Sequence, residues 1–498
     1  MPNVSPPRPP GNDLPLSALK RGREVELVME DFADRGKSLA RLAATEDRRG
    51  YVVFVAGAVP GDRVRARVMK RKKGFAEARL LEVLEPSGLR TEPRCEYFES
   101  CGGCKWQHVE YPAQLQMKGQ AAVSALARAG LDLGAADVRP PMGAEPRDGS
   151  GGVYFYRNKM EFSFSAQRWL TDWEIATGEE LDTSFALGLH VPGRFDKVLD
   201  LKACYLQSEW SARLVNGVRQ WAKANGWQPW HAREHTGFLR ILGVRTPAHT
   251  DDRMVNLVTS GHDEARMAAF AEFLRAEFPE VTTLVNTVND GPAQTSYGQA
   301  HVVFGPGTVR DTIGDYTYEI ASNAFFQTNT VAAERLYAVA REMAHFRPTD
   351  VVYDLYCGAG TISLYVADAV QKVVGVELVE EAVENARASA QANGVTNCEF
   401  VAGDMLELFR PELIEAHGRP DVLILDPPRA GLHPKVTGQI AHLRPERIVY
   451  VSCNPQTQAM DLARLSEAAA YTVEAVQPVD MFPHTHHVES VVGLRLAE

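Results

Sequence analysis

The hydrophobic positions of residues 20–86 recur with the short period that is typical of β-strands. The runs EVELVM, GYVVFV, DRVRARVM and ARLLEVL are rich in β-branched residues, and turn sequences such as DRG and VPGD separate them. Four short strands that follow one another so closely favour a small β-barrel of the oligonucleotide-binding type.

From residue 331 the pattern changes to alternating helices and strands. Helices are expected at 331–345 and 378–393, and two last strands near 472–477 and 488–495 should pair antiparallel because only a short loop joins them. The other strands are expected near 351–355, 373–377, 398–402, 421–425 and 447–452. This alternation is typical of right-handed βαβ units, and it predicts an α/β domain whose parallel sheet is covered on both faces.

The stretch between these two regions is less regular. Residues 87–110 are rich in cysteine, residues 111–130 predict a helix that ends at Gly130, and residues 150–320 mix strand-like runs with helices such as 208–225. We therefore predict a multidomain protein, with helix 111–130 packing on the last domain. The expected parts are a disordered proline-rich tail at 1–18, the barrel at 19–87, a central α+β module at 88–320 and the α/β domain at 321–498.

Composition narrows the class of protein. The 498 residues are 45% hydrophobic and 23% charged, as in globular domains, and no apolar run approaches the length of a membrane span. No export signal is recognisable, so the cytoplasm is the expected compartment. The net charge is −11, yet residues 63–79 of the barrel carry eight Arg or Lys against one Glu. This basic stripe favours RNA phosphates as partners, and a solvated charged face is the plainer alternative.

A glycine turn follows the first strand of the α/β domain, in VVYDLYCGAGTISL. Gly358 and Gly360 allow the backbone to turn sharply and to approach a ligand closely. Glu377, Asp404 and Asp426 then end three further strands, at the edge where open α/β sheets bind ligands. Glu377 stands where an acid can accept hydrogen bonds from ribose hydroxyls. A helix N-cap is the alternative reading of any one of these acids.

This pattern resembles the class I S-adenosylmethionine-dependent methyltransferases over residues 330–498, including their antiparallel last strands. The resemblance implies a Rossmann-like domain and S-adenosyl-L-methionine as the methyl donor.

A thiol and a carboxylate share the same edge of the predicted sheet. Cys453 ends the fifth strand in IVYVSCNPQT, and Glu489 begins the antiparallel strand in HTHHVES. The C5 atom of a pyrimidine is a poor nucleophile, but a thiolate that adds to C6 turns C5 into an enolate carbon able to take a methyl group. A general base must then remove the C5 proton. We interpret Cys453 as the nucleophile and Glu489 as the base, acting on a flipped-out pyrimidine. A packed core cysteine is the alternative.

The motifs SNAFFQTN, DLYCGAGT, GVE, DPPRAGL, SCNPQT and HTHHVE together resemble the uracil-5 RNA methyltransferase family, more specifically its 23S ribosomal RNA branch. The resemblance covers nearly the whole chain after residue 20 and implies that the barrel is a TRAM domain. It implies the same roles for Cys453 and Glu489, with Asp426 beside them at the catalytic centre. The implied contacts to S-adenosyl-L-methionine are Gln327, Tyr356, Thr361, Glu377, Asp404 and Asp426, together with Gly358 and Gly360.

Three cysteines lie close together in CEYFESCGGCKWQH. Cys95, Cys101 and Cys104 have the spacing C-x5-C-x2-C, which fits iron–sulfur ligation better than a zinc site. The family resemblance adds Cys204 as the fourth ligand of a [4Fe-4S] cluster. Because uracil methylation moves no electrons, we expect the cluster to be a structural clip.

The preferred function is methylation of uracil C5 in 23S ribosomal RNA, by a monomer with no membrane partner. The T-loop uridine of transfer RNA is an alternative substrate, and a non-catalytic iron–sulfur RNA-binding protein is a second alternative. Amine methylation is disfavoured because DPPR stands where an Asn-Pro-Pro-aromatic motif would be expected. Arg157, Asn158 and Lys159 in YRNKMEFSF are expected to contact RNA phosphates.

Overall fold

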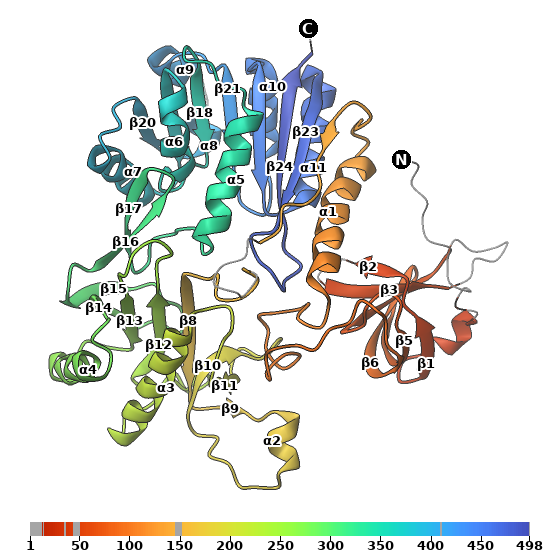
Figure 1. The fold of residues 1–498 in the computed structure, drawn as a ribbon, viewed down its shortest axis with the longest axis vertical. Helices are drawn as coiled ribbons and strands as arrows, with labels where there is room; N and C mark the ends of the chain where they lie inside the picture. Colours follow the sequence, from red (N-terminus) through yellow and green to blue (C-terminus); the bar gives the residue numbers. More distant parts are fainter. Residues whose placement is uncertain are drawn as a thin grey trace. The chain divides into compact units, whose positions relative to one another are not determined.

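The computed structural model describes residue 12 and residues 14–33, 36–42, 50–144, 152–408 and 411–497 (Figure 1). Most of the tail expected at 1–18 therefore lies outside the described residues. The chain forms two compact units, one made of residues 1–117 with 483–486 and the other of residues 118–482 with 487–498. None of the described helices is long and apolar enough to cross a membrane.

The N-terminal unit is built around a six-stranded sheet with the order β1-β5-β6-β4-β3-β2. Its strands are β1 (Glu24–Val28), β2 (Asp31–Ala33), β3 (Lys37–Arg41), β4 (Val52–Ala56), β5 (Arg63–Arg71) and β6 (Phe75–Glu85). Along β5, Val64, Ala66 and Val68 are fully buried and alternate with arginines on the other face. This period of two means that one face of the sheet covers the core and the other meets solvent.

The sheet has two more strands than the hydrophobic pattern predicts. β2 is short, and β3 begins and ends with a charged residue, so neither stands out in the sequence. Ser38 of β3 is nevertheless fully buried, because its hydroxyl donates a hydrogen bond to the carbonyl oxygen of Ala58 at 2.6 Å. The tail also ends earlier than predicted: a 3-10 turn, η1 (Leu16–Ala18), packs against the core of the sheet.

The first part of the second unit is an α+β arrangement around an eight-stranded mixed sheet with the order β15-β14-β13-β12-β8-β10-β11-β9. Its strands are β8 (Lys159–Ser165), β9 (Arg168–Trp169), β10 (Ala186–His190), β11 (Val198–Asp200), β12 (Leu239–Arg245), β13 (Met254–Thr259), β14 (Thr283–Val288) and β15 (Gln299–Phe304). The helices are α2 (Asp172–Ala176), α3 (Glu209–Ala224) and α4 (Glu264–Glu277). Apolar side chains of α3 and α4 pack with those of β8, β12 and β13 in one cluster, so these two helices cover the same face.

The C-terminal part of this unit is a second eight-stranded sheet, with the order β20-β19-β18-β21-β22-β24-β23-β7. Its strands are β18 (Val351–Leu355), β19 (Lys372–Glu377), β20 (Cys398–Ala402), β21 (Val422–Leu425), β22 (Arg447–Ser452), β23 (Tyr471–Val479), β24 (Glu489–Leu496) and the short β7 (Asp137–Val138). β18 to β22 run parallel, and β24 lies antiparallel between β22 and β23. The predicted α/β domain with an antiparallel last pair is confirmed.

Helices cover both faces of this sheet, as Figure 1 shows. The elements are α1 (Tyr111–Arg128), α5 (Thr330–Met343), α6 (Thr361–Val366), the 3-10 turn η3 (Ala367–Ala369), α7 (Glu380–Ala392), α8 (Met405–Leu408), α9 (Pro411–His417), α10 (Pro434–Leu443) and α11 (Pro455–Ala469). Val449 and Val451 of β22 pack with α5, α6 and α7, whereas Ile448 and Tyr450 pack with α10 and α11. Alternate residues therefore enter opposite cores, which explains the nearly continuous apolar strands. Ala125 and Leu126 bury the end of α1 in the second core.

A β-hairpin precedes α5 in the chain. It consists of β16 (Thr308–Ile313) and β17 (Tyr316–Ala321), and its apolar side chains belong to the same cluster as α5 and α6. The domain boundary expected between residues 320 and 321 falls inside β17.

Candidate active site

The turn after β18 has the backbone geometry that its glycines predict. Gly358 and Gly360 adopt positive φ angles of 55° and 72°. A Cβ at Gly360 would meet the ring of Phe400 at 2.8 Å, whereas a Cβ at Gly358 would meet nothing within 4 Å. Gly360 is therefore required by packing, and Gly358 leaves open space beside the backbone. Tyr356 also has a positive φ, of 66°, which is a strained conformation for a bulky residue.

The acids at the ends of β19 and β20 take different roles. Glu377 fastens the glycine turn, because one carboxylate oxygen accepts from the backbone N–H of Gly358 at 3.1 Å and the other from that of Val379 at 3.0 Å. Leu378 and Val379 beside it are exposed hydrophobic residues.

Asp404 is exposed and accepts from the N–H of Leu406 at 2.8 Å, the hydrogen bond of a helix cap. Asp404 therefore caps a helix with one oxygen, and its contact to the cofactor stays a prediction.

Two further acids lie deeper in the sheet. Burial raises the pKa of Asp354 to about 7, against the hydrogen bond that Ser363 donates to one of its oxygens at 2.5 Å. Its other oxygen is buried without a hydrogen-bond partner among the described residues. Burial and the charge of Asp354 raise the pKa of Asp426 to about 7 as well. A positively charged ligand at this edge would compensate both carboxylates.

Gln327 and Thr361 are brought together by a buried tyrosine. The hydroxyl groups of Tyr337 and Thr361 are 2.9 Å apart, and the Gln327 side chain lies near enough to Tyr337 to lower the pKa of its hydroxyl. Tyr337 lies on α5 and is 1% exposed, and burial raises its pKa. It is a residue that the sequence analysis missed, because a tyrosine in an amphipathic helix gives no signal beyond core packing.

The predicted nucleophile and base lie at the same end of two paired strands. Ser452 of β22 is opposite Ser490 of β24, so the next residue of β22 and the preceding residue of β24 are Cys453 and Glu489. Cys453 is half-buried and Glu489 is 8% exposed. The register therefore brings thiol and carboxyl to one site, as the antiparallel arrangement predicts.

Arg429 completes this site and was not singled out from the sequence. Its guanidinium acts on the thiol of Cys453, because its positive charge lowers the pKa of that thiol. Its backbone carbonyl accepts from Asn454 at 2.9 Å and from the hydroxyl of Thr457 at 3.2 Å. The SCNPQT turn is thus hydrogen-bonded to the DPPR loop. The sequence feature that could have indicated Arg429 is a basic residue directly after the two prolines that follow β21.

Charges around the thiol oppose one another. Burial and the carboxyl of Glu489 raise the pKa of Cys453, and Arg429 lowers it. Burial and the charge of Asp426 raise the pKa of Glu489 to about 8, again against Arg429. Near neutral pH the free site therefore favours a protonated Glu489 beside the thiol. Such shifted pairs are typical of sites that move protons.

Comparison with known proteins identifies the family. Residues 308–497 match the family described as tRNA (Uracil-5-)-methyltransferase, and residues 18–81 match the TRAM domain. An RNA methyltransferase of Chlorobaculum tepidum is 42% identical over 490 residues, which cover 96% of this chain and 98% of that protein. An RNA methyltransferase of Porphyromonas gingivalis is 40% identical, over 94% and 99% of the two chains. The chain belongs to the uracil-5 RNA methyltransferase family.

A solved structure resembles this methyltransferase along most of its length. It is the tRNA (uracil-54, C5)-methyltransferase of Pyrococcus abyssi in complex with S-adenosyl-L-homocysteine. The two chains are 26% identical with a TM-score of 0.69, and the match covers 91% of this chain and 98% of that one. S-adenosyl-L-methionine is the cofactor of the family, and the open space at Gly358 and the unpartnered oxygen of Asp354 fit a bound cofactor.

The three residues expected to contact RNA phosphates differ in their burial and in their hydrogen-bond partners. Asn158 is 5% exposed, and its amide donates to Gln327 and Thr330 rather than to solvent. The side chain is thus used inside the protein, and its RNA contact stays a prediction. Lys159 pairs with Glu161 at 2.7 Å, and Arg157 is half-buried.

The basic stripe is partly neutralised by glutamates on neighbouring strands. Arg63 pairs with Glu26 at 2.9 Å and Glu85 at 2.6 Å, and Arg67 pairs with Glu24 at 2.8 Å. Arg65 pairs with Glu82. Four exposed residues at the β5–β6 turn make no ion pair with another described residue: Lys70, Arg71, Lys72 and Lys73. The positive surface is thus concentrated at this turn rather than along the strand.

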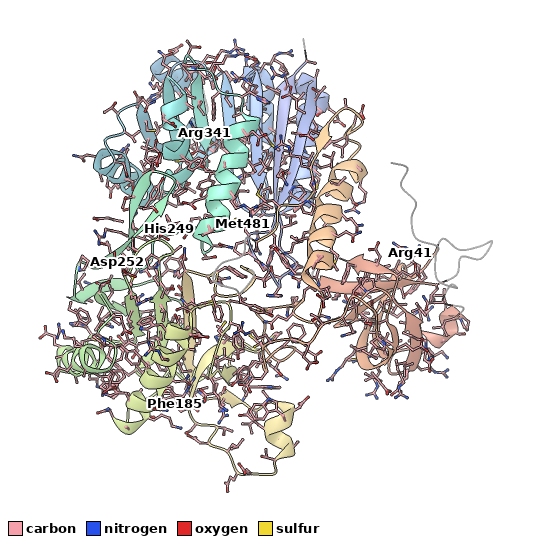
Figure 2. All side chains as sticks on the ribbon, in the orientation of Figure 1. Arg41, Phe185, His249, Asp252, Arg341 and Met481 are labelled. Atoms are coloured by element: carbon pink, nitrogen blue, oxygen red, sulfur yellow. The ribbon has the colours of Figure 1, made fainter. Side chains whose placement is uncertain are left out.

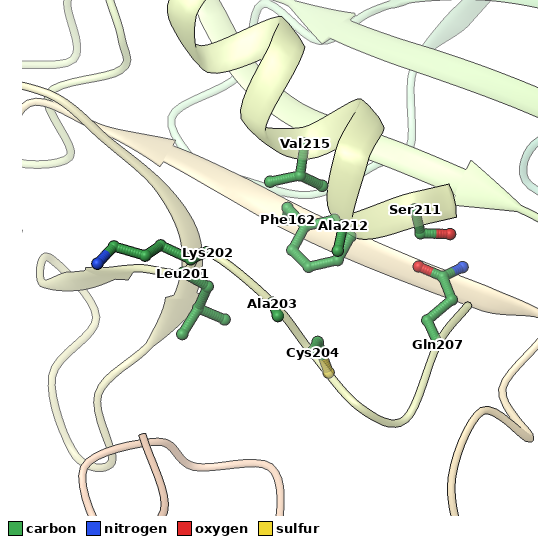
Figure 3. Close-up of a pocket in the computed structure, with 9 residues that line it drawn as sticks. All are labelled: Phe162, Leu201, Lys202, Ala203, Cys204, Gln207, Ser211, Ala212 and Val215. Carbon is green, nitrogen blue, oxygen red and sulfur yellow. The ribbon is translucent and has the colours of Figure 1, made fainter. Parts of the chain in front are cut away.

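The cysteine triplet lies in the N-terminal unit, and Cys204 lies in the other unit. The sulfur of Cys101 accepts from the N–H of Gly103 at 3.4 Å, and that of Cys104 from the amide of Gln107 at 3.2 Å. Cys204 lines a small hollow next to β8 and α3, which Figure 3 shows. No group of three or more His, Cys, Asp or Glu side chains in the described part of the chain is arranged to hold a metal ion. The [4Fe-4S] cluster therefore stays a prediction.

Proposed function

We propose that this methyltransferase modifies C5 of a uracil in RNA by covalent catalysis from Cys453. The observation that carries the proposal is the pairing of Ser452 with Ser490, which brings Cys453 and Glu489 to one end of β22 and β24. S-adenosyl-L-methionine, when bound, would supply an electrophilic methyl group, with S-adenosyl-L-homocysteine as the leaving group. We assign its binding to the glycine turn at Gly358 and Gly360 and to the following side chains: Gln327, Tyr356, Thr361, Glu377, Asp404 and Asp426.

The reaction divides into an addition and an elimination. The thiolate of Cys453 bonds to C6 of the uracil, and the electron pair of the C5–C6 double bond makes C5 nucleophilic enough to take the methyl group. Glu489 then removes the proton from C5. That electron pair restores the double bond and expels the thiolate, so the enzyme is regenerated with one proton gained by the base.

The electrostatics of the site suit this order of steps. Arg429 favours the thiolate needed for addition, and a protonated Glu489 does not repel it. Glu489 must be ionised when the C5 proton leaves. Because its pKa is raised to about 8, the fraction of Glu489 that can accept this proton rises with pH near neutrality.

Two substitutions test this proposal. Cys453→Ala is expected to abolish methylation while RNA binding is kept, and Glu489→Gln is expected to accumulate an RNA–enzyme adduct that survives denaturation. Cys398→Ala is the matched control, since this thiol lies in β20 and contacts the carbonyl oxygen of Ser363. Normal turnover of either active-site variant would contradict the assignment.

We propose 23S ribosomal RNA as the substrate, which the cysteine triplet and the resemblance of the motifs to the ribosomal RNA branch support. The T-loop uridine of transfer RNA is the second candidate, because the Pyrococcus abyssi structure is that of a tRNA enzyme. Mapping 5-methyluridine over total RNA from a deletion strain decides between them: the missing modification lies in 23S RNA under the first proposal and in transfer RNA under the second.

We propose that Cys95, Cys101, Cys104 and Cys204 hold a [4Fe-4S] cluster as a structural clip. The two N–H donors to sulfur, from Gly103 and Gln107, support it because such bonds stabilise thiolate ligands. Anaerobically purified protein should be brown, and Cys95→Ala should be colourless. Stoichiometric zinc in place of iron would refute the cluster.

For RNA docking we propose the β5–β6 turn at Lys70–Lys73, with Arg157 and Lys159 as further phosphate contacts. The exposure of the turn and the pairing of Arg63, Arg65 and Arg67 with glutamates support this narrower surface.

A further inference from the structure

The segment at residues 322–330 carries the proposed cofactor ligand Gln327 and has little regular structure of its own. Asn158, directly before β8, holds it by three hydrogen bonds. The amide nitrogen of its side chain donates to the carbonyl oxygen of Gln327 and to the hydroxyl of Thr330, both at 2.8 Å. Its backbone N–H donates to the carbonyl oxygen of Thr328 at 2.8 Å. Asn158 therefore holds the chain from the carbonyl group of Gln327 to the side chain of Thr330.

The segment is held from β12 as well. Arg245, the last residue of β12, is 4% exposed and donates to the carbonyl oxygen of Ala324. The next residue, Thr246, donates its N–H to the carbonyl oxygen of Asn158 at 2.7 Å. β8 and β12 are antiparallel neighbours in the central sheet, so the start of β8 and the end of β12 lie at the same edge. Residues at this edge bind the same segment from both strands.

On its other side the segment contacts the methyltransferase sheet and its helices. The side chain of Gln327 reaches Tyr337 of α5, whose hydroxyl lies 2.9 Å from that of Thr361 in the glycine turn. Asn329 caps α5 by accepting from Ala332 at 3.2 Å and donates to the carbonyl oxygen of Met481 at 2.9 Å. Met481, labelled in Figure 2, follows β23 in the loop that leads to Glu489. Residues 322–330 thus connect the central sheet with the catalytic end of the second sheet.

We propose that Asn158 is a positioning residue for the cofactor, which sets the Gln327 side chain through its main chain, rather than a contact to RNA. The inference rests on the proposed role of Gln327. The side-chain oxygen of Asn158 is buried without a hydrogen-bond partner among the described residues. The hydrogen bonds of this side chain are therefore the two that its amide nitrogen donates, and these explain why an amide stands at this position. Loss of the donors frees the Gln327 peptide, and the cofactor then has to order it on binding.

The test compares affinities for S-adenosyl-L-homocysteine and for RNA, each measured by calorimetry on the full chain. Asn158→Ala is expected to weaken S-adenosyl-L-homocysteine binding about tenfold or more while RNA binding stays within about twofold. Asn158→Asp keeps the size of the side chain but lacks the N–H donors. A similar loss of S-adenosyl-L-homocysteine affinity in this variant shows that the donors matter rather than the packing. Thr330→Val, which removes one acceptor, should weaken S-adenosyl-L-homocysteine binding in the same direction.

Thr287→Val is the matched control. It deletes a buried hydrogen bond of 2.8 Å to Asn256 in the same central sheet, away from the segment. It should lower the melting temperature without changing affinity for S-adenosyl-L-homocysteine. Weaker RNA binding with unchanged S-adenosyl-L-homocysteine binding in Asn158→Ala would overturn the proposal in favour of an RNA contact, and unchanged affinity for both would overturn it outright. Gln327→Ala tests the cofactor assignment separately, because unchanged S-adenosyl-L-homocysteine affinity in that variant would refute the role of Gln327 itself.

Discussion

The side-chain amide of Asn454 lies 2.9 Å from the carbonyl oxygen of Arg429. This hydrogen bond joins the turn after β22, which carries the thiol, to the loop after β21, which carries the guanidinium. The oxygen of the same amide caps α11 by accepting from the N–H of Gln456 at 3.2 Å. One asparagine therefore fixes the direction of the chain after Cys453 and the position of the cation that favours its thiolate.

Asn454→Asp separates these two functions, because a carboxylate can still cap α11 but cannot donate to Arg429. We expect kcat to fall about tenfold to a hundredfold, since small displacements of reacting groups cost this much, with KM for RNA little changed. Steady-state kinetics checks the split. Thr457→Val removes the weaker 3.2 Å contact to the same carbonyl and should show a smaller loss. A rise in KM alone would contradict a role in arranging the thiol.

The thiol of Cys453 should respond to its two charged neighbours in opposite directions. Arg429→Ala removes the cation that lowers the pKa of Cys453, so the pH at which the thiol is alkylated should rise. Glu489→Gln removes a carboxyl that raises this pKa, so the midpoint should fall. Iodoacetamide labelling of the Cys453 peptide, followed by mass spectrometry over a pH series, measures both. Shifts of the same sign would show that the two charges do not act on the thiol.

Glu489 should make the folded enzyme less stable as the pH rises. Its pKa is raised from 4.5 in the unfolded chain to about 8, so between these values the folded state holds a proton that the unfolded state releases. The contribution is fully present below about pH 4.5 and is lost by about pH 8. Glu489→Gln should therefore match the parent near pH 4.5 and exceed its free energy of unfolding at pH 8.5, by about 1 kcal/mol or more. Urea unfolding at the two pH values checks this, and a constant difference would contradict the raised pKa.

The β5–β6 turn should dominate the salt dependence of RNA binding. Lys72→Ala with Lys73→Ala is expected to reduce the slope of log affinity against log salt by about 1.4, because each phosphate contact to single-stranded RNA contributes about 0.7. Arg65→Ala with Arg67→Ala is the control, since both arginines pair with glutamates. Filter binding over a salt series measures the slopes. An equal reduction of the slope in both double variants would show that RNA binds along the whole basic stripe rather than at the turn.

The sequence predicted the elements that depend on hydrophobic periodicity, because burial on one or both faces dictates it. All five parallel strands of the second sheet and the antiparallel pair β23 and β24 were expected from apolar runs. β3 was missed because Ser38 is buried through a hydrogen bond rather than through apolarity. A single polar residue satisfied by a distant carbonyl leaves no trace in a hydrophobic pattern.

Site residues at the end of a strand could be predicted from the sequence. Partners that come from another helix or loop could not. Cys453 and Glu489 follow from strand direction alone, whereas Tyr337 and Arg429 depend on where α5 and the DPPR loop fold. The internal contacts of Asn158 were hidden for the same reason. A polar residue between Arg157 and Lys159 suggests a phosphate contact, and only the tertiary structure reveals that its amide donates to Gln327 and Thr330.

The position of β24 has a consequence for biosynthesis. This strand lies inside the sheet, between β22 and β23, and yet the ribosome makes it after every other described strand. Until it inserts, β22 and β23 each have an unpaired edge, and Cys453 has no carboxyl opposite it. Under the proposed mechanism a nascent chain cannot complete a catalytic cycle until this strand has emerged, and chains stalled before Glu489 are expected to be inert towards RNA methylation.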